Sequence, residues 1–349
     1  MAKKGKVSFL LILIILLVLA GVAFCFFINF LPQEKLTPVT NTSILANQNL
    51  NIEPKKARLI DGLLMSSYQD LYPVAVVIEN SADAWPLAGI NKANLIYETT
   101  AEAGITRFLV IYATDEIIDK IGPVRSARAY FIDWAEEYDA ILAHVGGSPE
   151  ALNKIKNEGV IDLDQYFQSQ YFWRSANRTA PHNVYTSSAL LKGAKEDLIK
   201  DKTPNYDNWR YKEDLEKNLR PNSQDIEINF STPLYKVNWR YDQEKNDYLR
   251  FQANEKYLTD SGEEVRSRNI IIQYAIVKVI DEVGRRDITT IGQGKALFFM
   301  DGQAKTGFWK RSNRKERTIF LDVNSNEIEL NRGITWIEIV SADTLIGYK

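Results

Sequence analysis

The stretch from Gly122 to Gly159 limits the choice of fold more than any other part of this 349-residue chain. Its order of residue types predicts a turn, a helix, a strand, a glycine turn and a second helix. The first helix carries apolar residues at helical spacing, namely Ala127, Tyr130, Phe131, Trp134 and Tyr138. A strand enclosed by two helices is typical of α/β folds, so the remaining segments are assigned around this stretch.

Short apolar runs with the composition of buried strands accompany this stretch. They are Pro73–Glu79, Leu95–Glu98, Thr106–Ala113 and Ala140–Val145, the last lying inside the stretch itself. Each run is continuous and most are rich in β-branched residues. Helical patterns lie between the third and fourth runs and after the fourth, as in parallel sheets. We therefore predict an α/β domain with a mixed or partly parallel sheet over residues 57–215.

The second half of the chain has the two-residue period of antiparallel strands. Residues 235–242 alternate strictly between apolar and polar types, and residues 249–253 alternate again after a polar turn. Further strand patterns follow over residues 270–280, 296–300, 318–321, 327–330 and 334–340. This spacing predicts an antiparallel, β-rich domain over residues 225–343.

The N-terminus predicts a membrane anchor or signal over residues 1–31. Three lysines within the first six residues precede an uncharged run from Val7 to Phe30, which is longer than the roughly 20 residues that span a bilayer as a helix. The positive-inside bias places the rest of the chain outside the membrane. Three outcomes stay open: an uncleaved single-pass anchor, lipidation of Cys25, and cleavage after Ala23. Residues 32–56 are polar and predict a flexible tether.

Composition narrows the classes of partner and cofactor. The 43 basic residues nearly balance the 45 acidic ones, which argues against nucleic acid as a partner. The single cysteine cannot form an intrachain disulfide or a cysteine-based zinc site. Only two histidines occur, so a histidine-rich metal site is excluded, and a mixed site of His144, His182, Asp162 and Asp164 has no supporting spacing. We expect neither a metal nor a cofactor.

Arg125 and Arg128 flank a predicted helix start at which Ser126 is the candidate N-cap. Arginine has the wrong sign for the helix dipole there, because a helix N-terminus favours negative charge. A phosphate, sulfate or carboxylate bound between the arginines would resolve this conflict. The alternative is a structural ion-pair network with Glu98, Glu102 or Asp119.

The second helix start consists of Gly146, Gly147, Ser148, Pro149 and Glu150. Proline at the first helical position and Gly159 after the end are typical helix boundaries, and Ser148 is the predicted N-cap. A glycine turn before a helix also lets backbone N–H groups approach an anion at Gly147 and Ser148. The alternative for Ser148 is a nucleophile served by His182. For His144 we consider two places, a buried site with a hydrogen-bond partner and a cleft beyond the strand end.

An irregular polar segment over residues 161–185 adds further candidate ligands. Long irregular segments inside compact domains are often functional. Arg174, Arg178 and His182 in this segment are predicted to complete a basic pocket with the arginines of the first helix start and with Arg107. The alternative is a solvated arginine loop.

Seven short motifs are spread along the chain. They are VAVVIEN (74–80), INKANLIYE (90–98), AEAGITRF (101–108), KIGPVRSAR (120–128), YDAILAHVGGSPEA (138–151), APHNVYTS (180–187) and GITWIEIV (333–340). Together these motifs resemble the YerB-like lipoprotein family. The resemblance covers nearly everything from about residue 70 to the end. It implies two consecutive domains of unknown function on the outer side of a Gram-positive membrane, and it transfers no catalytic residue.

These observations lead to a first hypothesis and two alternatives. The first is a membrane-anchored, extracytoplasmic envelope protein that binds an anionic envelope polymer, or a membrane or wall-synthesis protein, through the arginine pocket. The first alternative is an extracytoplasmic hydrolase that uses Glu79, Glu98 or Glu102 as acid or base, or Ser148 with His182 as nucleophile and base. The second is a structural protein that binds partners through an edge strand.

Overall fold

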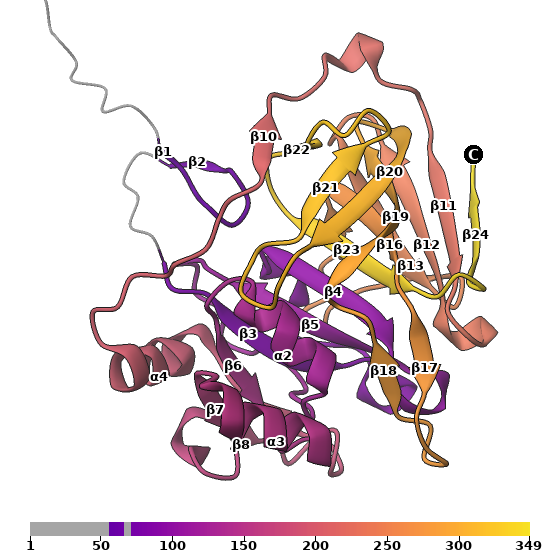
Figure 1. The fold of residues 1–349 in the computed structure, drawn as a ribbon. Coiled ribbons are helices and arrows are strands. Elements are labelled where there is room, and N and C mark those ends of the chain that lie inside the picture. The colour runs from indigo at the N-terminus through magenta and orange to yellow at the C-terminus, as the bar shows by residue number, and fades with distance from the viewer. Residues whose placement is uncertain (1–55, 66–70) are drawn as a thin grey trace, which may run out of the picture. The chain divides into compact units, whose positions relative to one another are not determined.

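A mixed sheet of ten strands runs through the part of the chain that the computed structural model describes, residues 56–65 and 71–349 (Figure 1). The strand order is β21-β20-β19-β16-β23-β4-β5-β3-β6-β7. The strands from the first half of the chain are β3 (Val74–Glu79), β4 (Leu95–Thr100), β5 (Thr106–Tyr112), β6 (Ile141–His144) and β7 (Asp162–Asp164). Those from the second half are β16 (Asn269–Tyr274), β19 (Gly292–Met300), β20 (Gln303–Arg311), β21 (Ile319–Asp322) and β23 (Thr335–Val340).

The first half of this sheet confirms the predicted mixed arrangement. Strand β5 pairs antiparallel with both β3 and β4, whereas β6 is parallel to β3 and to β7. The four predicted strands are present, and their apolar runs are buried because both faces of the sheet are covered. Strand β7 was not predicted, since its sequence Asp-Leu-Asp has neither the length nor the composition of a buried strand.

The second half is β-rich, as predicted, but not entirely antiparallel. A separate sheet contains β14 (Glu255–Lys256), β13 (Asp247–Gln252), β12 (Lys236–Asp242), β11 (Asp225–Asn229) and β24 (Leu345–Tyr348), with β15 (Arg266–Ser267) paired to β13. The departure is β23, which is parallel to both β16 and β4. Alternation along one strand does not reveal the direction of its neighbours, so the sequence pattern could not show this.

Strand β23 joins the two predicted domains into one sheet. It lies between β16 from the second half and β4 from the first, with Glu338 opposite Glu98. The predicted division between residues 215 and 225 is therefore not a division of the ten-stranded sheet. On one face, Val76 and Ile78 pack in a cluster with Trp239 of the other sheet, and on the other face Ala75 and Val77 pack with the first predicted helix.

Within the described residues the α-helices are α2 (Ala129–Glu136), α3 (Pro149–Glu158) and α4 (Ser188–Ile199). Helix α3 begins and ends as predicted: the Ser148 hydroxyl accepts a hydrogen bond from the Ala151 N–H at 3.3 Å, and Gly159 follows with a φ of 71°. The prediction of Ser126 as the N-cap of α2 is wrong, because Arg128 occupies that position. The Ala127 N–H donates to the Gly146 carbonyl, so residues before 128 are extended and cannot begin a helix.

Short elements complete the described residues. Two-stranded sheets are formed by β1 (Lys56–Ala57) with β2 (Leu64–Met65), β8 (Trp173–Arg174) with β9 (Val184–Tyr185), β10 (Arg210–Lys212) with β22 (Glu329–Asn331), and β17 (Val277–Val279) with β18 (Arg286–Ile288). The 3-10 helices are η1 (Ala82–Ala84), η2 (Ile90–Lys92), η3 (Glu102–Gly104), η4 (Ser169–Tyr171), η5 (Lys217–Leu219) and η6 (Pro233–Tyr235).

The predicted anchor, residues 1–31, lies outside the described residues, as does the predicted tether up to residue 55. Within the described ranges, no helix has the length and apolar character needed to cross a bilayer.

Candidate functional site

Polar residues collect where the parallel strands β3 and β6 end. Glu79, the last residue of β3, leads into Ser81 and η1, and β6 leads into the turn Gly146-Gly147. The segment 122–128 extends between these two ends, since Arg125 donates its N–H to Val77 of β3 and accepts one from Val145. The carboxyl ends of parallel strands are a common place for ligand sites in α/β proteins.

Glu79 organises the first group of side chains. Its carboxylate is buried, with 3% exposure, and accepts a hydrogen bond from the Ser81 hydroxyl at 2.9 Å. The Arg125 Nε lies 3.2 Å from the same oxygen, and the other oxygen lies 2.8 Å from His182 Nδ1. An ionised carboxylate only accepts hydrogen bonds, so Nδ1 is the donor. This contact fixes the ring orientation and leaves Nε2 of His182 as the nitrogen available to a ligand.

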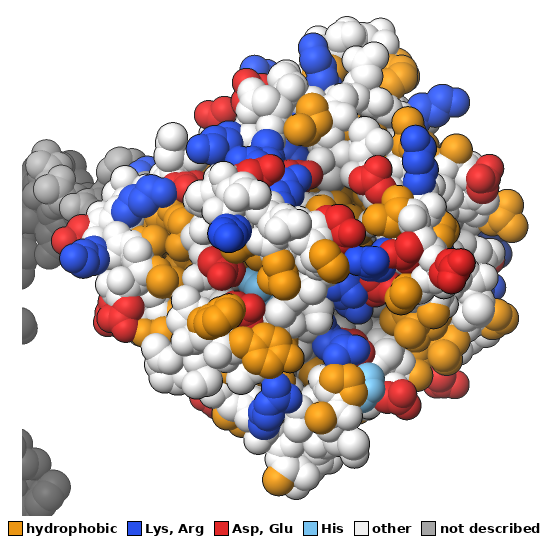
Figure 2. Space-filling view, turned by 60° about the horizontal axis from the view of Figure 1, so that its bottom comes forward, with side chains coloured by type: hydrophobic (Ala, Val, Ile, Leu, Met, Phe, Trp, Pro, Cys, Tyr) orange, Lys and Arg blue, Asp and Glu red, His pale blue; other side chains and the backbone are white. Residues whose placement is uncertain are grey.

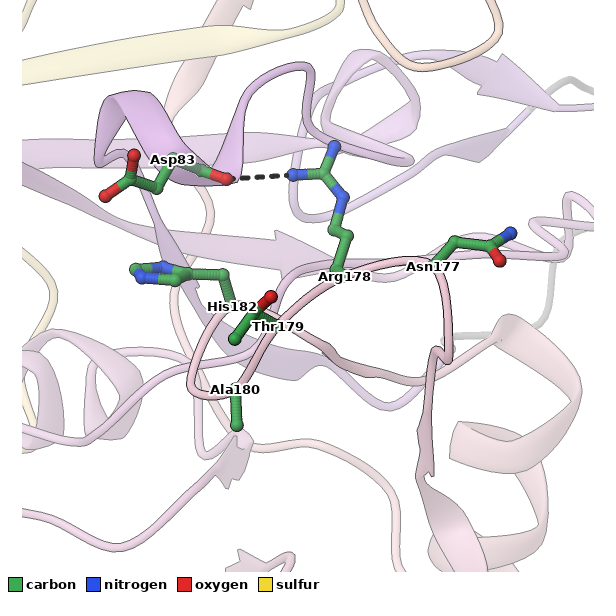
Figure 3. Close-up of a pocket in the computed structure, with 6 residues that line it drawn as sticks. All are labelled: Asp83, Asn177, Arg178, Thr179, Ala180 and His182. Carbon is green, nitrogen blue, oxygen red and sulfur yellow. Dashed lines mark hydrogen bonds between the residues drawn. The ribbon is translucent and has the colours of Figure 1, made fainter.

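An open pocket of about 660 Å³ lies beside this group. It is lined by Asp83, Asn177, Arg178, Thr179, Ala180 and His182 (Figure 3). Arg178 donates hydrogen bonds to the Asp83 carbonyl at 3.2 Å and to the Pro86 carbonyl at 2.9 Å. No carboxylate pairs with Arg178 within the part of the chain that the structure describes. In Figure 3 the Arg178 and His182 side chains extend to different sides of Thr179.

A second group forms around Glu102 in η3. The Arg128 Nε lies 2.5 Å from one of its carboxylate oxygens, and an Nη of Arg107 lies 3.4 Å from the other. Both arginines also donate to the Ser126 carbonyl, at 3.1 and 3.3 Å, which is the contribution of Ser126 here. Burial and the neighbouring charge of Arg128 lower the pKa of Arg107 to about 10.

The pKa of Glu102 shows which influence prevails in this group. Burial raises it, but the hydrogen bond from Arg128 and the charges of both arginines together bring it below its ordinary value. The sequence analysis predicted a bound anion between the arginines of the first helix start. For Arg128 that anion is the carboxylate of Glu102. This arrangement is the ion-pair network that the sequence analysis held as the alternative.

His144 occupies a separate, fully buried position. Its Nε2 lies 2.6 Å from an Asp162 carboxylate oxygen, and its Nδ1 lies 2.7 Å from the Gly146 carbonyl. This corresponds to the buried, hydrogen-bonded histidine of the two interpretations, and not to a cleft residue. His144 and His182 pair with different carboxylates, and no group of three or more His, Cys, Asp or Glu side chains suited to a metal occurs among the described residues.

The glycine turn before α3 is already occupied by protein groups. The Gly146 N–H donates to an Asp164 carboxylate oxygen at 2.9 Å, and the Ser148 N–H donates to the Ala127 carbonyl at 3.2 Å. Gly147 forms a bridge with Ala127. These bonds use N–H groups that an anion would need, and the Ser148 hydroxyl caps α3. No hydrogen bond joins Ser148 to His182 among the described residues: the Ser148 hydroxyl bonds to Ala151, and Nδ1 of His182 bonds to Glu79.

Arg174 lies outside the pocket. Its side chain is exposed and donates to the amide oxygens of Asn183 and Gln165, both at 3.0 Å. The five arginines and His182 that were predicted to form one basic pocket therefore do not all line it. Only Arg178 and His182 line it, and Arg125 reaches its edge through Glu79 and the Pro181 carbonyl.

Several side chains of this site were absent from the predicted ligand set. Glu79 was considered only as an acid or base, and Ser81, Asp83, Asn177 and Thr179 were not considered. The sequence does contain a signal for Glu79, Ser81 and Asp83, because these polar residues lie at or directly after the end of the buried run that forms β3. Asn177 and Thr179 carry no such signal, since their loop reaches η1 only through long-range contacts.

Comparison with known proteins shows that the chain matches one protein family over most of its length. Residues 62–201 match the N-terminal domain, and residues 226–337 the C-terminal domain, of a family described as "Protein of unknown function (DUF3048)". A relative from Bacillus subtilis (strain 168), described as "Putative lipoprotein YerB", is 33% identical over 280 residues, which cover 77% of this chain and 81% of that protein.

The fold has a solved counterpart. The crystal structure of the YerB protein from Bacillus subtilis matches with a TM-score of 0.73 and 30% identity, covering 84% of this chain and all of that one. The chain therefore belongs to the YerB-like family with two DUF3048 domains, as the sequence motifs indicated.

Proposed function

We propose that this member of the YerB-like family is a lipoprotein of the cell envelope that binds an anionic group in the pocket of Arg178 and His182. The ligand would be an envelope polymer or a partner protein on the outer side of the membrane. The description of the Bacillus subtilis relative as a lipoprotein supports the location, together with the lysine-flanked apolar run that precedes Cys25.

The pairing of the arginines carries the ligand-binding proposal. Arg107 and Arg128 both pair with the carboxylate of Glu102, and Arg125 pairs with that of Glu79. Arg178 instead bonds to two backbone carbonyls, which orient its guanidinium without cancelling its charge. A cation fixed in an open pocket is suited to a phosphate or carboxylate, because charge-assisted hydrogen bonds are among the strongest.

Binding to purified Gram-positive cell walls tests this proposal. In a sedimentation assay at low salt, Arg178→Ala is expected to reduce the bound fraction of the protein strongly. Arg174→Ala is the matched control, because it removes the same charge from β8, only four residues before Arg178 and outside the pocket. Equal loss in both variants would mean that net charge, and not the pocket, determines binding.

The contacts of the candidate catalytic residues leave few of them available for the hydrolase alternative. Glu98 is fully buried against Arg250, Glu102 is held by two arginines, and the Ser148 hydroxyl caps α3. Of the groups considered for acid–base or nucleophilic chemistry, only Glu79 and His182 are in contact with each other beside an open pocket.

A further inference from the structure

We infer that the pocket hydrolyses carboxylic esters that carry an anionic group, with His182 as the general base and Glu79 as its positioning residue. The inference rests on the proposed anion binding at Arg178 and adds a reaction to it. Its basis is the placement of one histidine between a buried carboxylate and an open pocket.

The contacts of Glu79 prepare His182 for proton transfer. With Nδ1 donating to Glu79 at 2.8 Å, a neutral imidazole carries its lone pair on Nε2. No described residue donates to or accepts from Nε2, and the side chain is 20% exposed at the pocket. A base needs such an unoccupied nitrogen within reach of its substrate.

Ser81 and Arg125 hold the Glu79 carboxylate in the position that this role requires. The Ser81 hydroxyl donates to one carboxylate oxygen at 2.9 Å, and Arg125 adds a positive charge 3.2 Å from that oxygen. Both contacts hold the carboxylate in place beside the ring. The Glu79 carboxylate lies against Nδ1 and can stabilise the imidazolium that forms when Nε2 accepts a proton, as the third member of a catalytic triad does.

The two ends of the pocket differ in charge, which predicts the substrate class. Arg178 provides positive charge at one side, whereas the Asp83 carboxylate lies on the side of His182 and points away from Arg178 (Figure 3). An anionic group is attracted to Arg178 and repelled by Asp83. The scissile ester must therefore be separated by a spacer from the anionic group, so that it faces His182.

The proposed step is a hydrolysis by water. Nε2 of His182 removes a proton from a water molecule, and the water oxygen forms a bond to the ester carbonyl carbon. The bond between that carbon and the alkoxy oxygen then breaks, and the alkoxy oxygen takes the proton from Nε2. The products are a carboxylic acid and an alcohol, and His182 returns to its neutral form.

Two chromogenic esters with the same six-carbon acyl chain test the inference. The mono-4-nitrophenyl ester of adipic acid carries a terminal carboxylate, and 4-nitrophenyl hexanoate does not. We expect His182→Ala to lower kcat/KM for both esters by about 100-fold or more, the typical contribution of a general base. Added imidazole is expected to restore activity to this variant, which a purely structural role of His182 would not allow.

The arginine variants separate the two proposals. Arg178→Ala should raise KM for the adipate ester by about tenfold and leave hexanoate unchanged, since one charge-assisted contact is lost. Arg174→Ala and Ser148→Ala should leave both esters unchanged. If Arg178→Ala affects the two esters equally while His182→Ala abolishes hydrolysis, the hydrolytic site stands and the anion subsite is refuted.

Other outcomes overturn the hydrolytic inference alone. If the wild type releases 4-nitrophenol no faster than His182→Ala does, the hydrolytic inference is refuted. This holds even if Arg178→Ala loses binding to cell walls. His182→Gln repeats the comparison with a side chain of similar size in case the alanine variant does not fold. Imidazole that fails to rescue His182→Ala would also contradict the role of Nε2.

Discussion

At the scale of single residues, Glu79 connects the stability of the fold to the proposed site. It is buried at the end of β3 and receives contacts from Ser81, Arg125 and His182. A buried carboxylate with two hydrogen-bond partners and an ion pair is costly to replace, because Ser81 and His182 lose their acceptor and Arg125 loses its counter-charge.

We predict that Glu79→Gln lowers the free energy of unfolding by about 2 kcal/mol, since Arg125 and His182 then face a neutral amide. Urea denaturation measures this change. Glu213→Gln is the control, because Glu213 pairs with Arg332 at a side-chain exposure of 81% and should contribute little. If both substitutions lowered the free energy of unfolding equally, the buried contacts of Glu79 would not contribute more stability than a surface ion pair.

The depressed pKa of Glu102 predicts how stability depends on acid. Because the folded protein holds this carboxyl ionised below its ordinary value of 4.5, unfolding takes up a proton in that range. The stability that Glu102 contributes is thus present above pH 4.5 and lost as the pH falls through the lower, folded value. In urea titrations the destabilisation caused by Glu102→Gln should be smaller at pH 3 than at pH 7, because part of the contribution of Glu102 is lost below pH 4.5. A difference that is the same at both pH values would contradict this.

At the scale of elements, the pairing of β4 with β23 places two carboxyl groups together. Glu98 and Glu338 are opposite one another and fully buried, with Arg250 as a shared partner. Burial, followed by the charge of Glu98, raises the pKa of Glu338 well above its ordinary value. One arginine cannot neutralise two carboxylates in such a place.

The raised pKa of Glu338 makes stability depend on pH in the opposite direction to the lowered pKa of Glu102. The folded protein keeps a proton on Glu338 that the unfolded chain releases above pH 4.5, so the stability falls as the pH rises through the folded pKa. Glutamine resembles the protonated form, so Glu338→Gln should gain stability relative to wild type between pH 5 and pH 8. Thermal unfolding at the two pH values measures this, and a difference that does not change with pH would show that Glu338 is ionised when folded.

The elements also show what the sequence can predict. The buried runs of β3, β4, β5 and β6 were found because continuous apolar segments have few other uses, and α3 was found from Ser148 and Gly159. The start of α2 was misplaced because the bond from Ala127 to Gly146 joins residues far apart in the chain. For the same reason, local patterns did not separate Arg178 from the arginines that pair with Glu79 and Glu102.

At the scale of the whole molecule, charges of both signs are mixed over the surface. Figure 2 shows basic and acidic side chains interspersed on one face, without a large area of one sign. This agrees with the near balance of 43 basic and 45 acidic residues. A ligand must therefore be recognised by a local site and not by the overall field.

The proposed lipid anchor gives a prediction for the complete chain. Cells that express the protein and incorporate an alkyne-labelled fatty acid should label the wild type and not Cys25→Ala, because Cys25 is the single cysteine available for lipidation. An unlabelled wild type that remains in the membrane fraction would instead support the uncleaved anchor.

The most direct test of the account concerns Arg178 itself. Calorimetric titration of the full chain with inorganic phosphate at low salt should show binding that Arg178→Ala weakens at least about tenfold, a loss of about 1.4 kcal/mol. Arg174→Ala should change the affinity by less than about twofold, because its guanidinium lies outside the pocket. Phosphate binding that is the same in wild type and Arg178→Ala would contradict the proposed anion site.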